Sequence, residues 1–427
     1  MFFILTWVNV SKLFFSYTVR RFSSIRWRIM NRTIDYGSVV IAAVAITAIA
    51  IFLLEAFGLR QSLLFLVGAG LGMALFHAAF GFTGGWRVFI RERNSEAVRA
   101  HILLLLFCTF LFFPLLGGVI PGLHPGAALA PVGYSVLVGA FLFGIGMQLG
   151  GGCGSGTLYT MGQGQVDMLI TLIFFIVGAT VGSIHLNWWL DLGGIGPVSI
   201  IKSAGWQLAL VLQLAVLVFL YFLVRWLDRR RNRPVISQHT AVQPAFLSRL
   251  IQGPWPYSWG VVALTLFAML TLLLAGHPWS ITFAFGLWGA KIWSALGGDI
   301  STWTYWNSGY PGQAVQSSVL ADITSVMDFG LILGAMLAAA LAGKYAPAMT
   351  LTARRVLAAV IGGLLLGYGA RLAFGCNIGA LLAGISTGSL HGWLWMIAAF
   401  IGNIVGVQAR VTLGMDKPWR MQHEAAY

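Results

Sequence analysis

The sequence predicts an all-α polytopic membrane protein, and three observations carry that prediction. Hydrophobic residues make up 58% of the chain and charged residues 9%, with a mean hydropathy of +0.84, whereas about a quarter of the residues in a soluble domain are charged. The apolar stretches reach the roughly 20 residues that a helix needs to cross the hydrocarbon core. These stretches are continuously apolar rather than alternating, which excludes a closed β-barrel, the other structure that can cross lipid.

About ten transmembrane helices are expected, arranged as two pseudo-symmetric repeats. Five elements of the first half match five of the second half in order, and the element at Gln207–Trp226 is left without a counterpart. The predicted elements are Tyr36–Phe57, Ser62–Phe80, Ala97–Ile120, Val132–Leu149, Met168–Leu190, Gln207–Trp226, Trp259–Ala275, Ile281–Leu296, Ile323–Leu341, Val356–Ala373 and Gly392–Val411.

Charge and apolarity divide the chain into five segments. The net charge of +14 does not indicate nucleic-acid binding, because the basic residues cluster in short loops beside apolar spans, where the positive-inside rule and anionic lipid headgroups explain them. The N-terminal segment is either a basic amphipathic stretch on the cytoplasmic surface or an artefact that precedes a true start at Met30. The segments are a basic N-terminal stretch (1–35), a first membrane repeat with one extra helix (36–226), a basic linker (227–257), a second membrane repeat (258–412) and a tail (413–427).

One short apolar segment occurs twice. Aligning Gly139–Leu158 with Gly362–Leu381 superposes eight identical residues in twenty positions. One of the eight is a cysteine, in a chain that has only three. Cys153 and Cys376 therefore occupy equivalent positions of an internal duplication. Cys108 lies in an apolar run and is expected to be a small buried hydrophobic residue.

A weaker repeat and the basic loops both indicate broken, re-entrant elements. Phe80–Gly84 resembles Phe285–Gly289, and Gly-interrupted apolar segments at matched positions are typical of a transport site. If every predicted element crosses, Lys344–Arg355 and Arg410–Arg420 fall on the side opposite to the basic loops of the first half. A re-entrant element around Gly286–Pro311 would repair this topology, so we expect one there.

The glycine–cysteine loops suit an anion. Gly152, Gly154 and Gly156 should interrupt the helix and expose backbone N–H groups. A helix expected to begin just after Gly162 and Gly164 would point its positive N-terminal end at the loop.

A plainer interpretation stands beside this one. Gly144 and Gly146 are expected to be helix-packing glycines, and a single cysteine among glycines is more often buried filler. The duplicate at Cys376 is what favours a functional pathway. The candidate pathway residues are Cys153, Cys376, Gly152, Gly154, Ser155, Gly156, Gly375, Asn377, Gly379, Arg371 and Lys291.

Ionisable residues at membrane depth are costly and usually functional. Arg371, Lys291 and Arg87 each lie close to a glycine-interrupted stretch, where they could attract an anion. For Arg87 we favour a side chain that reaches to the membrane interface instead. The candidate coupling carboxylates are Glu55, Asp322 and Asp328, of which the first two look terminal to their helices.

The two cysteine loops resemble the YeeE/YedE family of sulfur transporters. The resemblance rests on Gln148–Leu158 in the first half and on Leu365–Asn377 with Ser389–Trp393 in the second, and it spans about residues 36–412. It implies an inner-membrane protein of two pseudo-symmetric halves whose broken helices meet near mid-membrane. It also implies uptake of thiosulfate past cysteine thiols, and a small cytoplasmic sulfur-carrier protein as a partner.

The chain departs from the family pattern in one respect. Members of the family can carry further cysteines in the other two broken elements, whereas Phe80–Trp86 and Phe285–Lys291 contain none. Cys153 and Cys376 are therefore expected to carry the thiol chemistry alone. A selenium compound is an alternative substrate.

The remaining alternatives have weaker support. A membrane-embedded thiol enzyme should have a base beside each cysteine, but the neighbours in sequence are Gly, Ser and Asn. The glycines lack the strand and acidic partner of a dinucleotide site and the Gly-Lys-Ser/Thr of a P-loop, so no cofactor is expected. No local Cys/His spacing supports a metal site. The sequence leaves the oligomeric state open.

Overall fold

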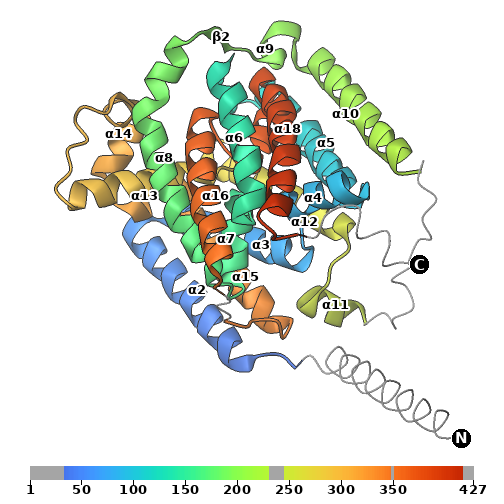
Figure 1. The fold of residues 1–427 in the computed structure, drawn as a ribbon, viewed down its shortest axis with the longest axis vertical. Coiled ribbons are helices and arrows are strands. Elements are labelled where there is room, and N and C mark those ends of the chain that lie inside the picture. The colour runs from blue at the N-terminus through green and yellow to red at the C-terminus, as the bar shows by residue number, and fades with distance from the viewer. Residues whose placement is uncertain (1–32, 230–244, 348–350, 417–427) are drawn as a thin grey trace, which may run out of the picture.

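The computed structural model describes residues 33–229, 245–347 and 351–416, and this part of the chain is almost entirely helical (Figure 1). It contains 10 helical stretches long and apolar enough to cross a membrane. The all-α polytopic class and the expected number of spans are thus confirmed. The expectations for residues 1–32, for 230–244 of the linker and for 417–427 of the tail lie outside the described residues.

The elements follow one another with short connections. The spanning stretches are Tyr36–Phe57, Leu59–Glu92, Glu96–Leu116, Tyr134–Gly162, Asp167–Asp191, Trp206–Asp228, Tyr257–Ala275, Ile323–Leu341, Ala353–Ser386 and Leu390–Thr412. The element bounds are α2 (Tyr36–Phe57), α3 (Leu59–His77), α4 (Phe82–Glu92), α5 (Glu96–Leu116), β1 (Pro131–Gly133), α6 (Tyr134–Gly150), α7 (Gly154–Gly162), α8 (Asp167–Asp191), β2 (Gly194–Pro197), α9 (Ile200–Ala204), α10 (Trp206–Arg229), α11 (Phe246–Gln252), α12 (Tyr257–Ala275), α13 (Thr282–Ala295), η2 (Thr304–Trp306), α14 (Gly309–Gln316), η3 (Val319–Ala321), α15 (Ile323–Leu341), α16 (Ala353–Leu372), η4 (Asn377–Leu382), α17 (Ala383–Ser386) and α18 (Leu390–Thr412).

One predicted span, Ile281–Leu296, is wrong as a span. Helix α13 has 14 residues and so measures roughly 21 Å, short of the roughly 30 Å hydrocarbon core. After α12 ends, the chain turns back into the protein, where Trp279 and Ile281 are buried, before α13 begins. A re-entrant element is therefore present, but it occupies 276–295 rather than 286–311. Gly286 and Gly289 lie inside α13 and do not interrupt it.

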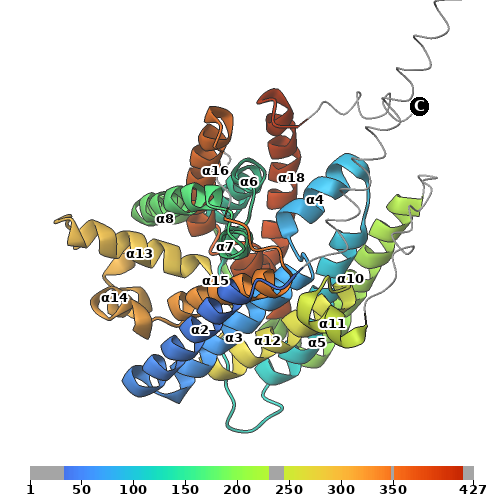
Figure 2. The same cartoon turned by 90° about the horizontal axis from the view of Figure 1, so that it is seen from below.

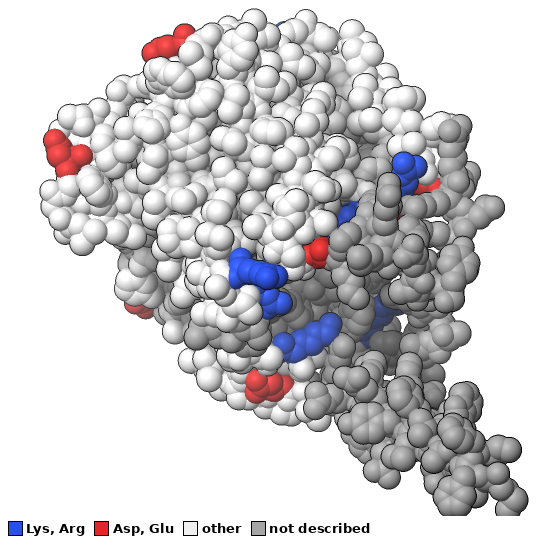
Figure 3. Space-filling view, viewed as in Figure 1, with Lys and Arg blue, Asp and Glu red and all other residues white. Residues whose placement is uncertain are grey.

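The basic loops gather at one end of the bundle, which removes the topology problem. Asp416 binds Arg91, before α5, at 2.8 Å and Arg410, at the end of α18, at 2.9 Å. The Ser95 hydroxyl donates to Asp228 at the end of α10. Figure 3 shows the basic side chains of this face running from its right edge to its lower middle. We call this the basic end; β2 and α9 lie at the opposite end (Figure 1), where β1 pairs with β2.

Four helices form the centre, and glycines set their spacing. Helix α16 packs on α6 and α8, and α18 packs on α6. A Cβ on Gly146 would lie 2.7 Å from the backbone nitrogen of Leu366 on α16, and one on Gly144 would overlap the backbone of Ala399 on α18. The expected role of these two glycines in helix packing is confirmed. Seen from below, α7 lies near the middle of this arrangement (Figure 2).

The contacts of Asp416 give a pH-dependent tether between α18 and the last turn of α4. The hydrogen bond from Arg410, together with the charges of Arg410, Arg87 and Arg91, lowers the pKa of Asp416. A carboxyl whose pKa is lowered by folding stabilises the fold above its unfolded value and loses this effect as the pH falls through the folded value. We expect Asp416→Asn to lower the melting temperature in detergent by about 1–2 °C at neutral pH. The difference from wild type should begin to shrink near the ordinary carboxyl pKa of roughly 4 and vanish once the pH lies below the lowered folded pKa; a difference that persists there would contradict the electrostatic explanation.

Candidate functional site

Cys153 lies in the three-residue break between α6 and α7. Its backbone is extended (φ −90°, ψ −165°), and its sulfur accepts the N–H of Gly156 at 3.4 Å. A helix does begin after Gly164, since α8 starts at Asp167, but the helix that begins at the cysteine loop is α7, which starts at Gly154. The helix tolerates its glycines because it is packed against α8 and α15, and tertiary packing outweighs the propensity cost of glycine.

Cys376 repeats this geometry at the start of η4. Its backbone has nearly the same conformation (φ −95°, ψ −164°), and its sulfur accepts the N–H of Ile378 at 3.4 Å. The glycine before each cysteine is required by close packing against the helix that follows. A Cβ on Gly152 would lie 2.9 Å from the nitrogen of Thr157, and one on Gly375, which has φ +151°, would lie 2.6 Å from the nitrogen of Ala380.

The fold brings the two cysteine loops together. A Cβ on Gly154, the first residue of α7, would lie 3.0 Å from the Sγ of Cys376 and 3.3 Å from the side chain of Thr282. The start of α7, the start of η4 and the start of α13 therefore meet at one place. Both thiols are buried there, with exposures of 1% for Cys153 and 0% for Cys376.

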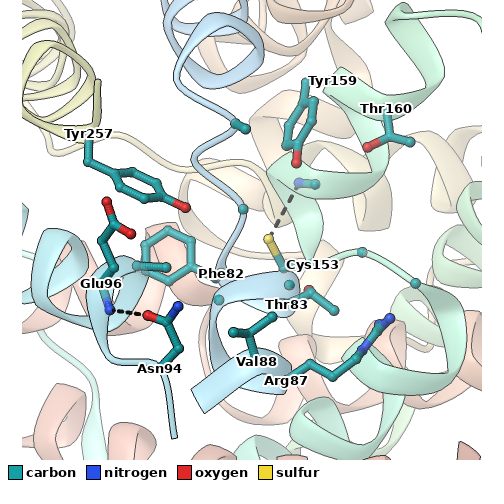
Figure 4. Close-up of a pocket in the computed structure, with 18 residues that line it drawn as sticks. Phe82, Thr83, Arg87, Val88, Asn94, Glu96, Cys153, Tyr159, Thr160 and Tyr257 are labelled. Atoms are coloured by element: carbon teal, nitrogen blue, oxygen red, sulfur yellow. Dashed lines mark hydrogen bonds between the residues drawn. The ribbon is translucent and has the colours of Figure 1, made fainter. Parts of the chain in front are cut away.

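A cavity of about 350 Å³ reaches Cys153 from the basic end (Figure 4). Its wall combines the 79–85 stretch, where α4 starts, with Gly151, Gly152 and Tyr159. Its outer lining includes Asn94 and Glu96, which are exposed, so the cavity opens at the surface. Among the predicted pathway residues, Cys153, Gly152 and Gly156 line this cavity.

Arg87 also lines this cavity, and the preference for placing it at the interface missed that role. Its Nε donates to Oε1 of Gln148 at 2.8 Å, and the amide nitrogen of Gln148 donates to Asn403 at 2.6 Å. Gln148 is fully buried. A cationic side chain is thereby held in the wall of the cavity that leads to Cys153. The sequence signal that could have identified this role is the position of Arg87 three residues after Gly84, beside a glycine-interrupted stretch.

Asn377 is fully buried directly after Cys376, and neither its amide nitrogen nor its amide oxygen has a hydrogen-bond partner among the described residues. Buried polar groups normally have partners, so this side chain can serve a polar guest. Ser155 lies 3.5 Å from the sulfur of Cys153. Gly379, in η4, packs near Ser280 of the re-entrant stretch.

Arg371 is nine-tenths buried at the end of α16. Its guanidinium carbon lies 4.5 Å from the ring centre of Tyr305 and 5.4 Å from that of Trp306. Its Nε and one terminal nitrogen have no hydrogen-bond acceptor in the described part of the chain. Gly286 packs so closely on the guanidinium that a Cβ there would overlap it.

Lys291 is placed differently from the other candidates. Its ammonium donates to the backbone carbonyls of Val315 at 2.7 Å and Ser317 at 2.5 Å. It thus ties α13 to the end of α14, and it does not line the cavity beside Cys153.

A family model described as sulphur transport matches residues 77–405, which include both cysteine loops. The chain belongs to this sulphur-transport family. It is a multi-pass membrane protein and a transporter rather than an enzyme.

Individual relatives agree with the family. The thiosulfate transporter TsuA of Spirochaeta thermophila is 28% identical over 285 residues, covering 62% of this chain and 74% of the relative. TsuA of Escherichia coli is 24% identical over 346 residues, covering 78% and 90%. The probable transporter YedE of Escherichia coli is 33% identical over 153 residues, covering 36% and 37%. These names support transport of a small sulfur-containing anion.

Proposed function

We propose that this protein takes up thiosulfate, or a closely related sulfur-containing anion, and passes it from Cys376 to Cys153. The observation that carries the proposal is the meeting of two equivalent cysteine loops at the start of α7, with a cavity leading away from one of them. The family and the names of its relatives support the substrate class. A selenium analogue of the anion stays an alternative, because thiols would contact selenium in a similar way.

The chemistry of each loop suits weak, serial binding. At each cysteine a helix begins, so backbone N–H groups and the positive end of the helix dipole stabilise a passing anion. A thiol is a weak donor with little cost of burial, so it can contact the terminal sulfur of thiosulfate without retaining it. Conduction requires such binding, strong enough to admit the ion and weak enough to release it. Among the described residues, the two sulfurs have backbone N–H groups and Ser155 as hydrogen-bond partners. None of these partners is a base that could remove the thiol proton.

The two halves are proposed to be related by an approximate two-fold axis. Three packing contacts recur when each helix is replaced by its counterpart in the other half. Helix α8 packs on α16 as α18 packs on α6. Helix α13 packs on α8 as α4 packs on α18, and α15 packs on α7 as α5 packs on α17. The packing also suggests a counterpart for the unmatched span, because α2 packs on α15 as α10 packs on α5. Such a relation is typical of transporters that alternate between two openings.

The basic end is proposed to face the cytoplasm at a bacterial inner membrane. The positive-inside rule favours this orientation, and the cavity beside Cys153 then opens inward. A small cytoplasmic sulfur-carrier protein that receives the anion would dock around the mouth of this cavity, near Asn94 and Glu96.

Growth on thiosulfate tests the proposed activity. Cells that cannot assimilate sulfate and lack their own thiosulfate uptake should grow on thiosulfate as sole sulfur source when they express this protein. Cells with the empty vector should not. If the expressing cells carry the protein in the membrane and still fail to grow on thiosulfate, the substrate is another solute.

Arg371 is proposed to hold the anion near the opposite end before it reaches Cys376. Replacing Arg371 by Gln removes a buried positive charge with free donors, so the KM for thiosulfate should rise about tenfold, equivalent to roughly 1.4 kcal/mol. Lys291→Met is the matched control, since that ammonium already binds two carbonyl groups. Kinetics of labelled thiosulfate uptake separate the two variants. Equal KM values for Arg371→Gln and wild type would assign Arg371 to packing alone.

A further inference from the structure

Asp328 is a fully buried acid inside α15, with an exposure of 0%. Neither of its carboxylate oxygens has a hydrogen-bond partner among the residues that the structure describes. An ionised carboxylate without a partner is costly in the interior of a membrane protein, and such groups usually serve ion or proton pathways. Asp328 has no part in the proposed passage of the anion from Cys376 to Cys153.

Asp328 lies on α15, which packs against α7 and α13, the helices whose starts meet at Cys376. It is within electrostatic range of the Cys376 thiol, and Asn377 beside that thiol also lacks partners. An ionised Asp328 would repel an anion held at Cys376. A protonated Asp328 would remove that repulsion and offer an O–H donor. Binding of the anion and binding of a proton should therefore favour each other.

Among the described residues, no cationic side chain forms an ion pair with Asp328. Within the described chain, the ionisable groups that interact electrostatically with Asp328 are Asp322 and Cys376. Asp322 already accepts hydrogen bonds from the hydroxyl groups of Tyr310 and Ser325. Helices α2, α3, α7, α11 and α13 and the η3 turn pack against α15. The ionisable groups on these elements are Tyr36, Glu55, Arg60, His77, Tyr159, Arg249 and Lys291.

We propose that Asp328 takes up one proton with each anion and releases it on the side of the Cys153 cavity, which makes transport a symport of the anion with a proton. The proposal rests on the proposed function for the identity of the anion. A proton fits this site because Asp328 is a titratable group whose carboxylate oxygens have no hydrogen-bond partner among the described residues. The proton comes from water on the side where the anion binds and returns to water where the anion leaves.

Purified protein in liposomes tests the coupling without any mutation. With the membrane potential clamped at zero, an interior one pH unit more alkaline than the outside should drive about tenfold accumulation of labelled thiosulfate, since one proton crossing one pH unit balances a tenfold concentration ratio. Addition of thiosulfate without a gradient should acidify the interior. Wild-type uptake that equilibrates without accumulating and moves no protons overturns the proposal.

Two variants locate the coupling. Asp328→Asn should exchange labelled thiosulfate across the membrane but no longer accumulate it under the pH gradient or acidify the interior. Asp191→Asn, which changes an exposed carboxylate at the end of α8, should behave like wild type. Accumulation by Asp328→Asn at the wild-type level overturns the assignment to this residue. Asp328→Glu restores a titratable group and should restore gradient-driven uptake if Asp328→Asn proves inactive.

The same liposomes separate failure of this inference from failure of the proposed function. Exchange of labelled for unlabelled thiosulfate, measured at equal pH on both sides, needs no proton coupling. Its absence in wild type would refute thiosulfate transport itself. Its presence together with indifference to the pH gradient would refute proton coupling alone.

Discussion

Replacing either Cys153 or Cys376 by Ala should reduce thiosulfate uptake by roughly ten- to hundredfold, the loss expected when one contact to a charged group is removed from a pathway. The two sites act in series, so the second cysteine cannot compensate for the first. Each replacement removes only a sulfur that caps a short helix start. We therefore expect both variants to accumulate in the membrane and to fail in uptake of labelled thiosulfate.

Cys108 provides the matched control for this experiment. It is fully buried on α5, like the other two cysteines, but it belongs to neither loop at the start of α7. Cys108→Ala should take up thiosulfate at the wild-type rate. Wild-type uptake by both Cys153→Ala and Cys376→Ala would show that the thiols are not part of the route.

The second large effect is on stability, at the crossing of α6 with α16. A Cβ on Gly369 would lie 2.5 Å from the carbonyl oxygen of Gly139 and 2.7 Å from the nitrogen of Phe143. These are backbone atoms, which cannot rotate away as the end of a side chain can. Overpacking of this kind costs about 1–3 kcal/mol, so Gly369→Ala should lower the melting temperature in detergent. Gly369→Leu should leave little folded protein.

Gly37 controls for the change of residue type. It lies in the exposed first turn of α2, where an added Cβ would meet only Asp35 at 3.6 Å. Gly37→Ala should leave the melting temperature unchanged or raise it slightly, because alanine favours a helix over glycine. A Gly369→Ala protein as stable as wild type would mean that α6 and α16 are packed less closely than described.

The sequence predicts the spans well because apolar length is a direct consequence of the membrane thickness. The exception is α13. Its apolarity resembles that of a spanning helix, and only the tertiary structure reveals that the chain turns back through Trp279 and Ile281 before α13 starts. The excess of basic residues was the better guide, because it required a re-entrant element in the second half.

The internal repeat predicts the two cysteine loops of the candidate site, and charge at membrane depth adds Arg371 and Lys291 as candidates. The duplication identifies Cys153 and Cys376, since both copies keep the cysteine and the glycine before it. It does not identify residues that come from unrepeated positions. The rings of Tyr305 and Trp306 around Arg371 and the hydrogen bond from Arg87 to Gln148 join segments far apart in the chain. Single-sequence patterns carry no signal for such contacts.

Exchange in liposomes tests most directly whether the pathway selects the terminal sulfur of thiosulfate. The purified protein should exchange internal thiosulfate for labelled external thiosulfate, and unlabelled sulfate in excess should not compete. Sulfate carries the same charge and similar oxygens but lacks the terminal sulfur that the thiols would contact. Competition by sulfate as strong as by thiosulfate itself would contradict the cysteine pathway and leave a general anion transporter.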